Sequence, residues 1–126
     1  MGNETQNILV VEDDADIRDV FVQVLELEGY EIAAAGNGRE ALEHLRRSKQ
    51  PDLILLDIMM PVMDGWQFRA EQQRNPELAS IPVVILTAHG VPQHNTTING
   101  VAGFLKKPVE LETLLNTVKQ QFLNEA

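Results

Sequence analysis

Carboxylate side chains stand directly after two apolar stretches of this 126-residue chain. Glu12 and Asp13 follow the stretch Ile8–Val11, and Asp57 follows Leu53–Leu56. Because open parallel sheets bind their ligands beyond the carboxyl ends of the strands, we expect these three side chains to converge at one edge of a sheet. Carboxylates that lie so close together repel one another, and at least one pKa should rise unless a cation neutralises them.

A divalent cation at this edge would relieve the repulsion and favour phosphoryl chemistry. The ligands are hard oxygens and the three histidines are too scattered for a zinc site, so the expected ion is Mg²⁺, with Mn²⁺ as a substitute. A carboxylate beside such an ion can attack phosphorus and form an aspartyl phosphate. Thr87 also follows an apolar stretch, and Lys106 and Lys107 follow another. A hydroxyl and a lysine ammonium can both bind phosphoryl oxygens. The sequence thus predicts a phosphate-accepting site centred on Asp57.

The stretches that would carry these residues alternate between strand-like and helix-like patterns. Short runs of β-favouring residues predict strands at residues 8–11, 30–35, 53–56, 81–86 and 104–106. Apolar residues at helical spacing predict helices that follow Asp14 and Asn37 and that include residues 66–74 and 111–122. Strands that are buried on both faces and joined by helices imply right-handed crossovers and a parallel sheet. The predicted fold is a doubly wound α/β domain.

A few residues have a structural interpretation that competes with a functional one. Asp14 precedes a predicted helix and is typical of a helix cap. Asp64 stands beside Gly65, as in a turn, and Trp66 is more typical of packing than of recognition. Residues 89–100 are rich in poor helix formers, so any helix there should be short or mobile.

Four stretches resemble, in content and in order, the signature sequences of response regulator receiver domains. They are Ile8-Leu-Val-Val-Glu-Asp-Asp14, Leu53-Ile-Leu-Leu-Asp57 followed by Met60-Pro-Val-Met-Asp-Gly65, Val84-Ile-Leu-Thr-Ala88, and Gly103-Phe-Leu-Lys-Lys-Pro108. Each is weakly specific alone, but together they span nearly the whole chain. The resemblance implies a flavodoxin-like (βα)5 sandwich with strand order 2-1-3-4-5. It also implies one receiver domain over residues 1–126, with residues 1–6 flexible and no output domain.

The same resemblance implies the roles of the acidic residues. Asp57 would be the phosphoacceptor, and Asp13 would bind Mg²⁺ directly. Glu12 would act mostly through water, and the backbone carbonyl of Met59 would be a further ligand. Met59 and His89 would also flank the phosphoryl group and tune how water reaches it. Because Met59 is bulky and apolar, we expect a fairly long-lived phosphoryl state.

Further roles follow from the resemblance for the later stretches. Lys107, the hydroxyl of Thr87 and the backbone N–H of Ala88 would contact the phosphate. Phe104 would be the switch aromatic, which moves inward when the threonine is drawn to the phosphate. It lacks the hydroxyl of the commoner tyrosine, so this ring cannot donate a hydrogen bond. The peptide bond between Lys107 and Pro108 is expected to be cis.

The expected function is signalling rather than catalysis. A sensor histidine kinase or a histidine phosphotransfer protein would donate the phosphoryl group, and an unknown downstream protein would read the altered surface. The chain would be a monomer or a phosphorylation-dependent dimer, with weak autophosphatase activity at most. Two alternatives stay open, a phosphorylation-independent adaptor and a phosphatase with an aspartyl nucleophile. The phosphatase is less consistent with Met59, because that chemistry usually has a second acid two residues after the nucleophile.

Composition narrows the partners. Lys and Arg total 10 against 19 Asp and Glu, a net charge of -9, which disfavours direct binding to nucleic acid. The absence of cysteine excludes disulfides and thiolate metal sites. No run approaches the ~18 apolar residues of a membrane span, and no leader-like segment begins the chain, so a cytoplasmic location is expected.

Two features depart from the family pattern. The interval from Thr87 to Lys107 is shorter than usual, and it contains the helix-poor residues 89–100. Gln72 stands in a predicted helix where an apolar residue is typical. Neither departure lies at the predicted acceptor site.

Overall fold

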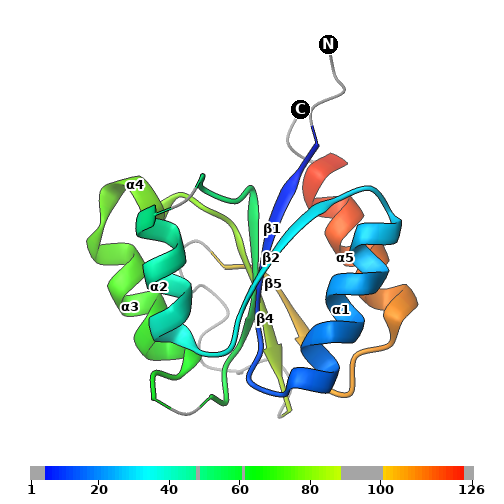
Figure 1. Cartoon of the computed structure of the whole chain (residues 1–126), viewed down its shortest axis with the longest axis horizontal. Coiled ribbons are helices and arrows are strands. Elements are labelled where there is room, and N and C mark those ends of the chain that lie inside the picture. Colours follow the sequence, from blue (N-terminus) through cyan, green and yellow to red (C-terminus); the bar gives the residue numbers. More distant parts are fainter. Residues whose placement is uncertain (1–4, 48, 61, 89–100, 124–126) are drawn as a thin grey trace.

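Five parallel strands form one sheet in the computed structural model, which describes residues 5–47, 49–60, 62–88 and 101–123 (Figure 1). The strands are β1 (Asn7–Val11), β2 (Glu31–Ala35), β3 (Leu53–Asp57), β4 (Val83–Thr87) and β5 (Val101–Lys106). Their spatial order is β2-β1-β3-β4-β5, which confirms the predicted order. The order reverses at β1 and β3, so the ligand site of this fold is expected beyond the ends of these two strands.

Helices cover both faces of the sheet. They are α1 (Ala15–Leu27), α2 (Gly38–Arg47), α3 (Gly65–Arg74), α4 (Pro76–Ala79) and α5 (Leu111–Leu123). Figure 1 shows α1 and α5 on one side of the sheet and α2, α3 and α4 on the other. Within the described residues, no helix is both long and apolar enough to cross a bilayer.

Alternate residues of the central strands fill two separate cores. On β3, Ile54 and Leu56 pack toward α2 and α3, whereas Leu53 and Leu55 pack toward α1 and α5. All four side chains are fully buried. Both faces of these strands are therefore apolar, which is why polar side chains are confined to the strand ends.

Polar side chains cap the helices where the chain leaves the sheet. The Asp14 carboxylate accepts hydrogen bonds from the N–H groups of Asp16 and Ile17, as predicted, and Asn37 accepts one from Glu40. The interpretation of Asp64 as a turn residue was wrong. It caps α3, and with Gln67 it forms a reciprocal pair of side-chain to backbone hydrogen bonds.

Some predicted boundaries also differ from those observed. The fourth strand begins at Val83 rather than at residue 81, and the fifth begins at Val101 rather than at residue 104. The sequence predicts a helix over residues 66–74, with Asn75 and Pro76 as its stop. Instead Asn75 caps the short helix α4 by accepting a hydrogen bond from the N–H of Glu77, with Pro76 at its first position. The predictions for residues 89–100 lie outside the described part of the chain.

Gln72 is a fully buried polar residue that joins three elements. Its Nε2 donates hydrogen bonds to the carbonyls of Leu78 and Ile81, at 2.8 and 3.2 Å. Its Oε1 accepts a 2.6 Å hydrogen bond from Arg69 Nη1, and burial lowers the pKa of that arginine. The side chain therefore links α3 to α4 and to the segment before β4. The glutamine therefore has a structural role at a position where an apolar residue was expected.

Gln72→Leu should lower the free energy of unfolding by about 2–3 kcal/mol, although leucine is the more apolar residue. The substitution removes a donor from the Ile81 carbonyl and an acceptor from the Arg69 guanidinium, and unpaired buried polar groups cost about 1–3 kcal/mol each. Urea denaturation measures the difference. Gln120→Leu, at an exposed position of α5, is the matched control and should have little effect. Equal stabilities of the two variants would contradict this role for Gln72.

Candidate functional site

The alternation of the strands brings the predicted site residues to one edge and one face of the sheet. The residues two positions before Glu12, Asp57 and Lys107 all lie in the core against α1 and α5, and they are Val10, Leu55 and Leu105. Because side chains alternate with a period of two along a strand, the three site residues continue toward this face where the strands end. Residues separated by 95 and 50 positions therefore meet.

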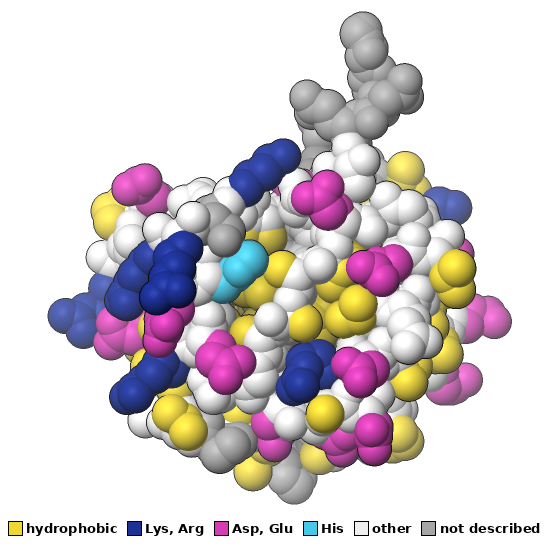
Figure 2. All heavy atoms as spheres, in the orientation of Figure 1, with side chains coloured by type: hydrophobic (Ala, Val, Ile, Leu, Met, Phe, Trp, Pro, Cys, Tyr) yellow, Lys and Arg dark blue, Asp and Glu magenta, His cyan; other side chains and the backbone are white. Residues whose placement is uncertain are grey.

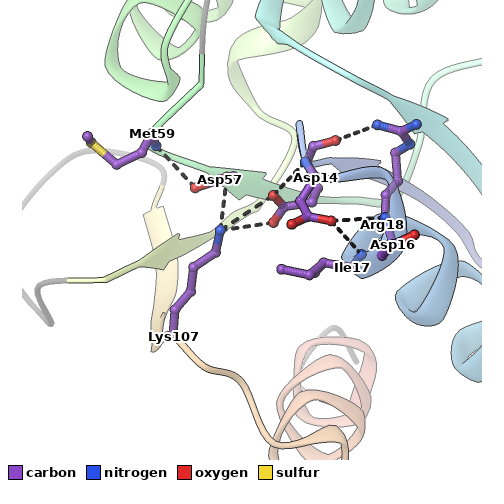
Figure 3. Close-up of polar contacts among 8 residues, drawn as sticks. Asp14, Asp16, Ile17, Arg18, Asp57, Met59 and Lys107 are labelled. Atoms are coloured by element: carbon purple, nitrogen blue, oxygen red, sulfur yellow. Dashed lines mark hydrogen bonds and ion pairs between the residues drawn. The ribbon is translucent and has the colours of Figure 1, made fainter.

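The carboxylates and the lysine are in direct contact. Oxygen atoms of Glu12, Asp13 and Asp57 lie within 4.8 Å of one another. Lys107 Nζ lies 3.0 Å from Asp57 Oδ2 and 3.1 Å from Glu12 Oε1. Figure 3 shows the Lys107 side chain reaching from below β5 to Asp57 at the end of β3. The structure thus brings the predicted acidic residues and the predicted lysine together.

The cluster is buried on one side and open on the other. Glu12 is 0% exposed and Asp57 is 1% exposed, whereas Asp13 lies at the surface. The Asp57 carboxylate also accepts a hydrogen bond from the backbone N–H of Met59, at 3.1 Å from Oδ1. Each oxygen of Asp57 therefore has one donor. A reactant would have to approach this carboxylate from the open, Asp13 side.

Burial makes Glu12 the electrostatic focus of the site. Burial, together with the nearby Asp57, raises the pKa of Glu12 to about 7, even though hydrogen bonds from the N–H of Asp14 and from Lys107 to its carboxylate act in the opposite direction. For Lys107, burial alone would lower the pKa, but the hydrogen bonds to Asp57 and to Glu12 outweigh it and the pKa is raised. The lysine therefore stays protonated between the two carboxylates.

One ammonium group does not balance three carboxylates. When Glu12, Asp13 and Asp57 are all ionised, Lys107 leaves the cluster with a formal charge of −2. Glu12 Oε1 is buried and has no hydrogen-bond donor, because its ion pair with Lys107 lacks hydrogen-bond geometry. An all-oxygen ligand set, an excess of negative charge and an unsatisfied buried oxygen all fit a divalent cation such as Mg²⁺.

The loop that follows Asp57 is held close to the acceptor by a glycine. The N–H of Gly65 donates a 2.9 Å hydrogen bond to the carbonyl of Ile58. A Cβ atom at Gly65 would lie 2.8 Å from the Ile58 Cα and 2.9 Å from the Asp57 carbonyl oxygen. Because both neighbours are backbone atoms, only glycine allows this close approach.

Met59 contacts the acceptor through its backbone alone. The side chain is 61% exposed and points away from Asp57 and Lys107 (Figure 3). The role of its carbonyl as a cation ligand stays a prediction. His89, the other residue expected to tune access of water, lies outside the described residues.

The predicted switch residues lie at the other face of the sheet. Thr87 ends β4 and is nearly buried, and Phe104 on β5 packs with the core that lies against α2 and α3. Phe104 pairs with Ile85 on β4, and Lys106 pairs with Thr87. Thr87 is two residues beyond Ile85 on the same strand, so Thr87 and Phe104 lie on the same face of the sheet. Ala88 is exposed beyond the end of β4, and the Lys107–Pro108 peptide bond is cis. The structure therefore places a hydroxyl and an aromatic ring close together on neighbouring strands, on the face of the sheet opposite the cluster.

An apolar groove beside the cluster was not predicted from the sequence. Its volume is about 630 Å³, and it opens between α1 and the segment that follows Lys107. The larger apolar side chains that line it include Ile17, Val20, Phe21, Val109 and Leu111. Val20 lies on α1 at helical spacing from other apolar residues, and it is 43% exposed at this groove. The spacing of apolar residues along the sequence predicts which face of a helix is apolar. It does not show whether other parts of the protein cover that face.

Arg18 also contacts the site, although the sequence analysis did not identify it. It lies on α1, and its Nη1 donates a 2.8 Å hydrogen bond to the backbone carbonyl of Glu12 (Figure 3). The available signal was its position one helical turn beyond the cap Asp14. That spacing permits a contact with the end of β1 but does not require one.

Basic side chains do not form a separate ligand surface on the face shown in Figure 2. Lys and Arg side chains gather there over α2, with acidic side chains among them. Arg47 on this helix is paired with Glu43 at 3.7 Å. The expectation that the chain does not bind nucleic acid stays a prediction.

Comparison with known proteins gives one consistent family. Residues 8–119 match the response regulator receiver domain. The polar-differentiation response regulator DivK of Brucella anthropi is 32% identical over 123 residues, which cover 96% of this chain and 98% of that protein. The probable transcriptional regulator ycf27 of Porphyra purpurea is 40% identical over 90 residues, covering 71% of this chain and 35% of that protein. The alignment thus spans about a third of the length of that regulator.

Solved structures agree with the sequence matches. The chemotaxis response regulator CheY4 of Vibrio cholerae superimposes with a TM-score of 0.85 at 32% identity, over 94% of this chain and 99% of that chain. The receiver domain of a signal transduction histidine kinase from Syntrophus aciditrophicus gives a TM-score of 0.85 at 32% identity, over 96% of this chain and 92% of that chain. The same fold therefore occurs in a chemotaxis response regulator and in the receiver domain of a histidine kinase.

Glu12 should make the stability of the metal-free protein depend on pH. Its carboxyl group binds a proton more tightly in the folded chain, with a pKa of about 7, than at the ordinary value of 4.5. Stability from this group is therefore complete below about 4.5 and is lost as the pH rises through about 7. Relative to Glu12→Gln, the wild-type protein should lose roughly 3 kcal/mol across this range.

Urea denaturation of both proteins in a chelator, at a series of pH values, measures this difference. At each pH, the free energy of unfolding of Glu12→Gln is subtracted from that of the wild-type protein. The subtraction removes the contributions of the titrating groups that the two proteins share. A difference in free energy of unfolding that stays constant with pH would contradict the raised pKa of Glu12.

Proposed function

The chain belongs to the response regulator receiver domain family, and on that premise we propose that it accepts a phosphoryl group on Asp57 from a phosphohistidine of a sensor kinase or phosphotransfer protein. Receiver domains work as signalling phosphoacceptors in two-component systems. The observation that carries the proposal is the contact of the buried Asp57 carboxylate with Lys107 Nζ at 3.0 Å, inside a cluster of acidic residues.

The proposed step is a transfer between a nitrogen and an oxygen. One carboxylate oxygen of Asp57 forms a bond to phosphorus while the bond from phosphorus to the histidine nitrogen breaks, and the electron pair of that bond stays on the imidazole. Met59 N–H and Lys107 hold the carboxylate in one orientation. The protonated lysine also offsets the negative charge of the incoming phosphoryl oxygens.

Glu12, Asp13 and Asp57 are the residues that would hold Mg²⁺, with the Met59 carbonyl as a further ligand. When bound, the ion would neutralise the carboxylates and the phosphoryl oxygens. The chain's own part is to keep two of the carboxylates out of water and the third at the surface. Asp13 is therefore the side chain that the ion would meet first.

The groove between α1 and the segment after Lys107 suits the donor protein. Asp57 is 1% exposed, so a donor histidine has to enter from a protein surface that covers the residues around the site. Val20 and Leu111 are partly exposed apolar side chains at that position. An apolar helix face of the donor would bury them and place its histidine beside the cluster.

The readout would pass through the opposite face of β4 and β5. A phosphoryl group on Asp57 offers oxygen atoms to the Thr87 hydroxyl, the Ala88 N–H and Lys107. Movement of Thr87 would free space that Phe104, one register step away, could enter. A changed surface over β5 would then select a downstream protein, in the cytoplasm, by contact, onward phosphotransfer or dimerisation.

Incubation with a small phosphodonor and Mg²⁺ should add one phosphoryl group, detected by intact mass. Asp57→Asn should abolish the gain, because an amide cannot form the acyl phosphate, while Asp52→Asn at the opposite end of β3 should not. Chelation of Mg²⁺ should suppress the reaction. Lack of any gain in wild type would favour the adaptor, and continuous turnover of unrelated phosphoesters would favour a phosphatase.

Met59→Asn should shorten the lifetime of the phosphoryl group, because the amide can bind a water molecule near phosphorus and the thioether cannot. The native side chain is 61% exposed, so the substitution should not disturb the core. The decay of phosphorylated protein, followed by mass after removal of the donor, measures the lifetime.

Val62→Asn on the same loop is the matched control. Val62 is 68% exposed and has a φ of 68°, a conformation that asparagine tolerates better than valine. The phosphoryl group on Val62→Asn should last as long as that on the wild-type protein. Faster decay in the control, or unchanged decay in Met59→Asn, would contradict the role of Met59.

A further inference from the structure

The backbone of Glu12 is fixed by hydrogen bonds on both sides of the residue. Its N–H donates to the carbonyl of Ala35 at 3.0 Å, and its carbonyl accepts from Arg18 Nη1 at 2.8 Å. The first bond continues the pairing of β1 with β2. The second comes from a half-buried side chain on α1, so it lies outside the regular pattern of the sheet.

The carbonyl that Arg18 contacts belongs to the peptide group that joins Glu12 to Asp13. A peptide group is planar, so a hydrogen bond to this oxygen also sets the direction of the Asp13 N–H and the position from which the Asp13 side chain begins. Glu12 and Asp13 supply two of the three carboxylates in the cluster. One side-chain hydrogen bond thus bears on the orientation of both.

The neighbouring loop leaves room for this arginine. A Cβ atom at Gly36 would lie 3.4 Å from Arg18 Nη1 and 3.3 Å from Glu40 Oε1. The N–H of Gly36 donates a 2.8 Å hydrogen bond to that Glu40 oxygen. Gly36 follows directly after Ala35, whose carbonyl accepts the N–H of Glu12. The guanidinium therefore lies between the end of β1 and a loop that is itself held in place.

We propose that Arg18 is a positioning residue, which orients the Glu12–Asp13 peptide group so that both carboxylates face the cation. The proposal rests on the proposed function, because it assigns Arg18 to the same cation site. This role of Arg18 requires no contact with the phosphoryl group. Its effect passes through one backbone carbonyl.

The two possible roles of Arg18, positioning of the ligands and repulsion of the cation by its charge, predict opposite changes in Mg²⁺ affinity when the arginine is removed. A guanidinium near the cluster repels Mg²⁺, so if only its charge mattered, removal would tighten Mg²⁺ binding. If its hydrogen bond positions the ligands, removal should weaken Mg²⁺ binding. Loss of an outer hydrogen bond to a metal ligand typically costs about tenfold or more in affinity. The sign of the change therefore separates the two roles.

Calorimetric titration with Mg²⁺ alone is the test, with Arg18→Met, Arg18→Lys and Arg39→Met compared with wild type. Arg18→Met keeps a long apolar side chain but removes the donor and the charge, and it should weaken Mg²⁺ binding about tenfold. Arg18→Lys keeps a donor and the charge and should fall between Arg18→Met and wild type. Arg39 is exposed on α2, and Arg39→Met controls for the loss of one positive charge.

A kinetic comparison separates positioning from a general loss of structure. At saturating Mg²⁺, the rate of phosphorylation of Arg18→Met by a small phosphodonor should return close to that of wild type. Thermal unfolding of the metal-free proteins shows whether the variant is folded. Weaker binding that Mg²⁺ cannot restore at saturation would mean that Arg18 is merely structural and would overturn the proposal.

A measurement on the metal-free protein keeps this inference separate from the proposed function. Amide hydrogen exchange at Asp13 and Asp14 should be faster in Arg18→Met than in wild type and unchanged in Arg39→Met. Equal exchange in wild type and Arg18→Met, or tighter Mg²⁺ binding by Arg18→Met, overturns the positioning role. A wild-type chain that binds no Mg²⁺ contradicts the proposed function, while the exchange data still decide whether Arg18 orders the peptide group.

Discussion

The ion pairs that join Lys107 to Asp57 and Glu12 are the interactions on which the site depends. Both carboxylates are almost fully buried, and the lysine side chain is 23% exposed. Buried carboxylates without a cationic partner would be strongly destabilising. The lysine makes their burial tolerable but leaves negative charge in excess, so the same cluster that needs Lys107 for stability also favours a divalent cation and an incoming phosphoryl group.

The rest of the fold serves to bring these charges together and to shield them. The two apolar cores bury Glu12 and Asp57 at the strand ends, and the alternation along β1, β3 and β5 directs Glu12, Asp57 and Lys107 to one face. Thr87 and Phe104 lie toward the opposite face of the sheet. A charge added on Asp57 can therefore be sensed on the other side of β4, which is a geometric basis for a switch between two surfaces.

Much of this arrangement could be predicted from sequence because it depends on simple periodicity. Apolar runs that end at Glu12 and Asp57, together with the rule that parallel strands bind ligands at their carboxyl ends, place the carboxylates, whereas the choice of Lys107 over Lys106 came from the resemblance to receiver domains. Gln72 was noticed as unusual, but its partners are carbonyls near α4, a helix that was not expected because Asn75 was interpreted as a stop rather than as a cap.

Contacts between a side chain and a distant backbone group were harder to predict. The type and position of Arg18 do not show whether it turns toward the end of β1 or toward solvent, since both fit an arginine on the second turn of a helix. The groove beside Lys107 likewise depends on how far α1 lies from the segment that begins α5. Such distances follow from the packing of whole elements, and no local pattern encodes them.

Identification of the modified residue tests the central claim most directly. Borohydride reduces an acyl phosphate to an alcohol, so treatment of the phosphorylated protein should convert the modified aspartate to homoserine, which peptide sequencing by mass spectrometry locates. The buried, lysine-paired carboxylate predicts homoserine at position 57 alone, and only when Mg²⁺ was present during phosphorylation. Homoserine at Asp13 or Asp14, or a phosphate that resists borohydride on a hydroxyl such as that of Thr87, would contradict the account.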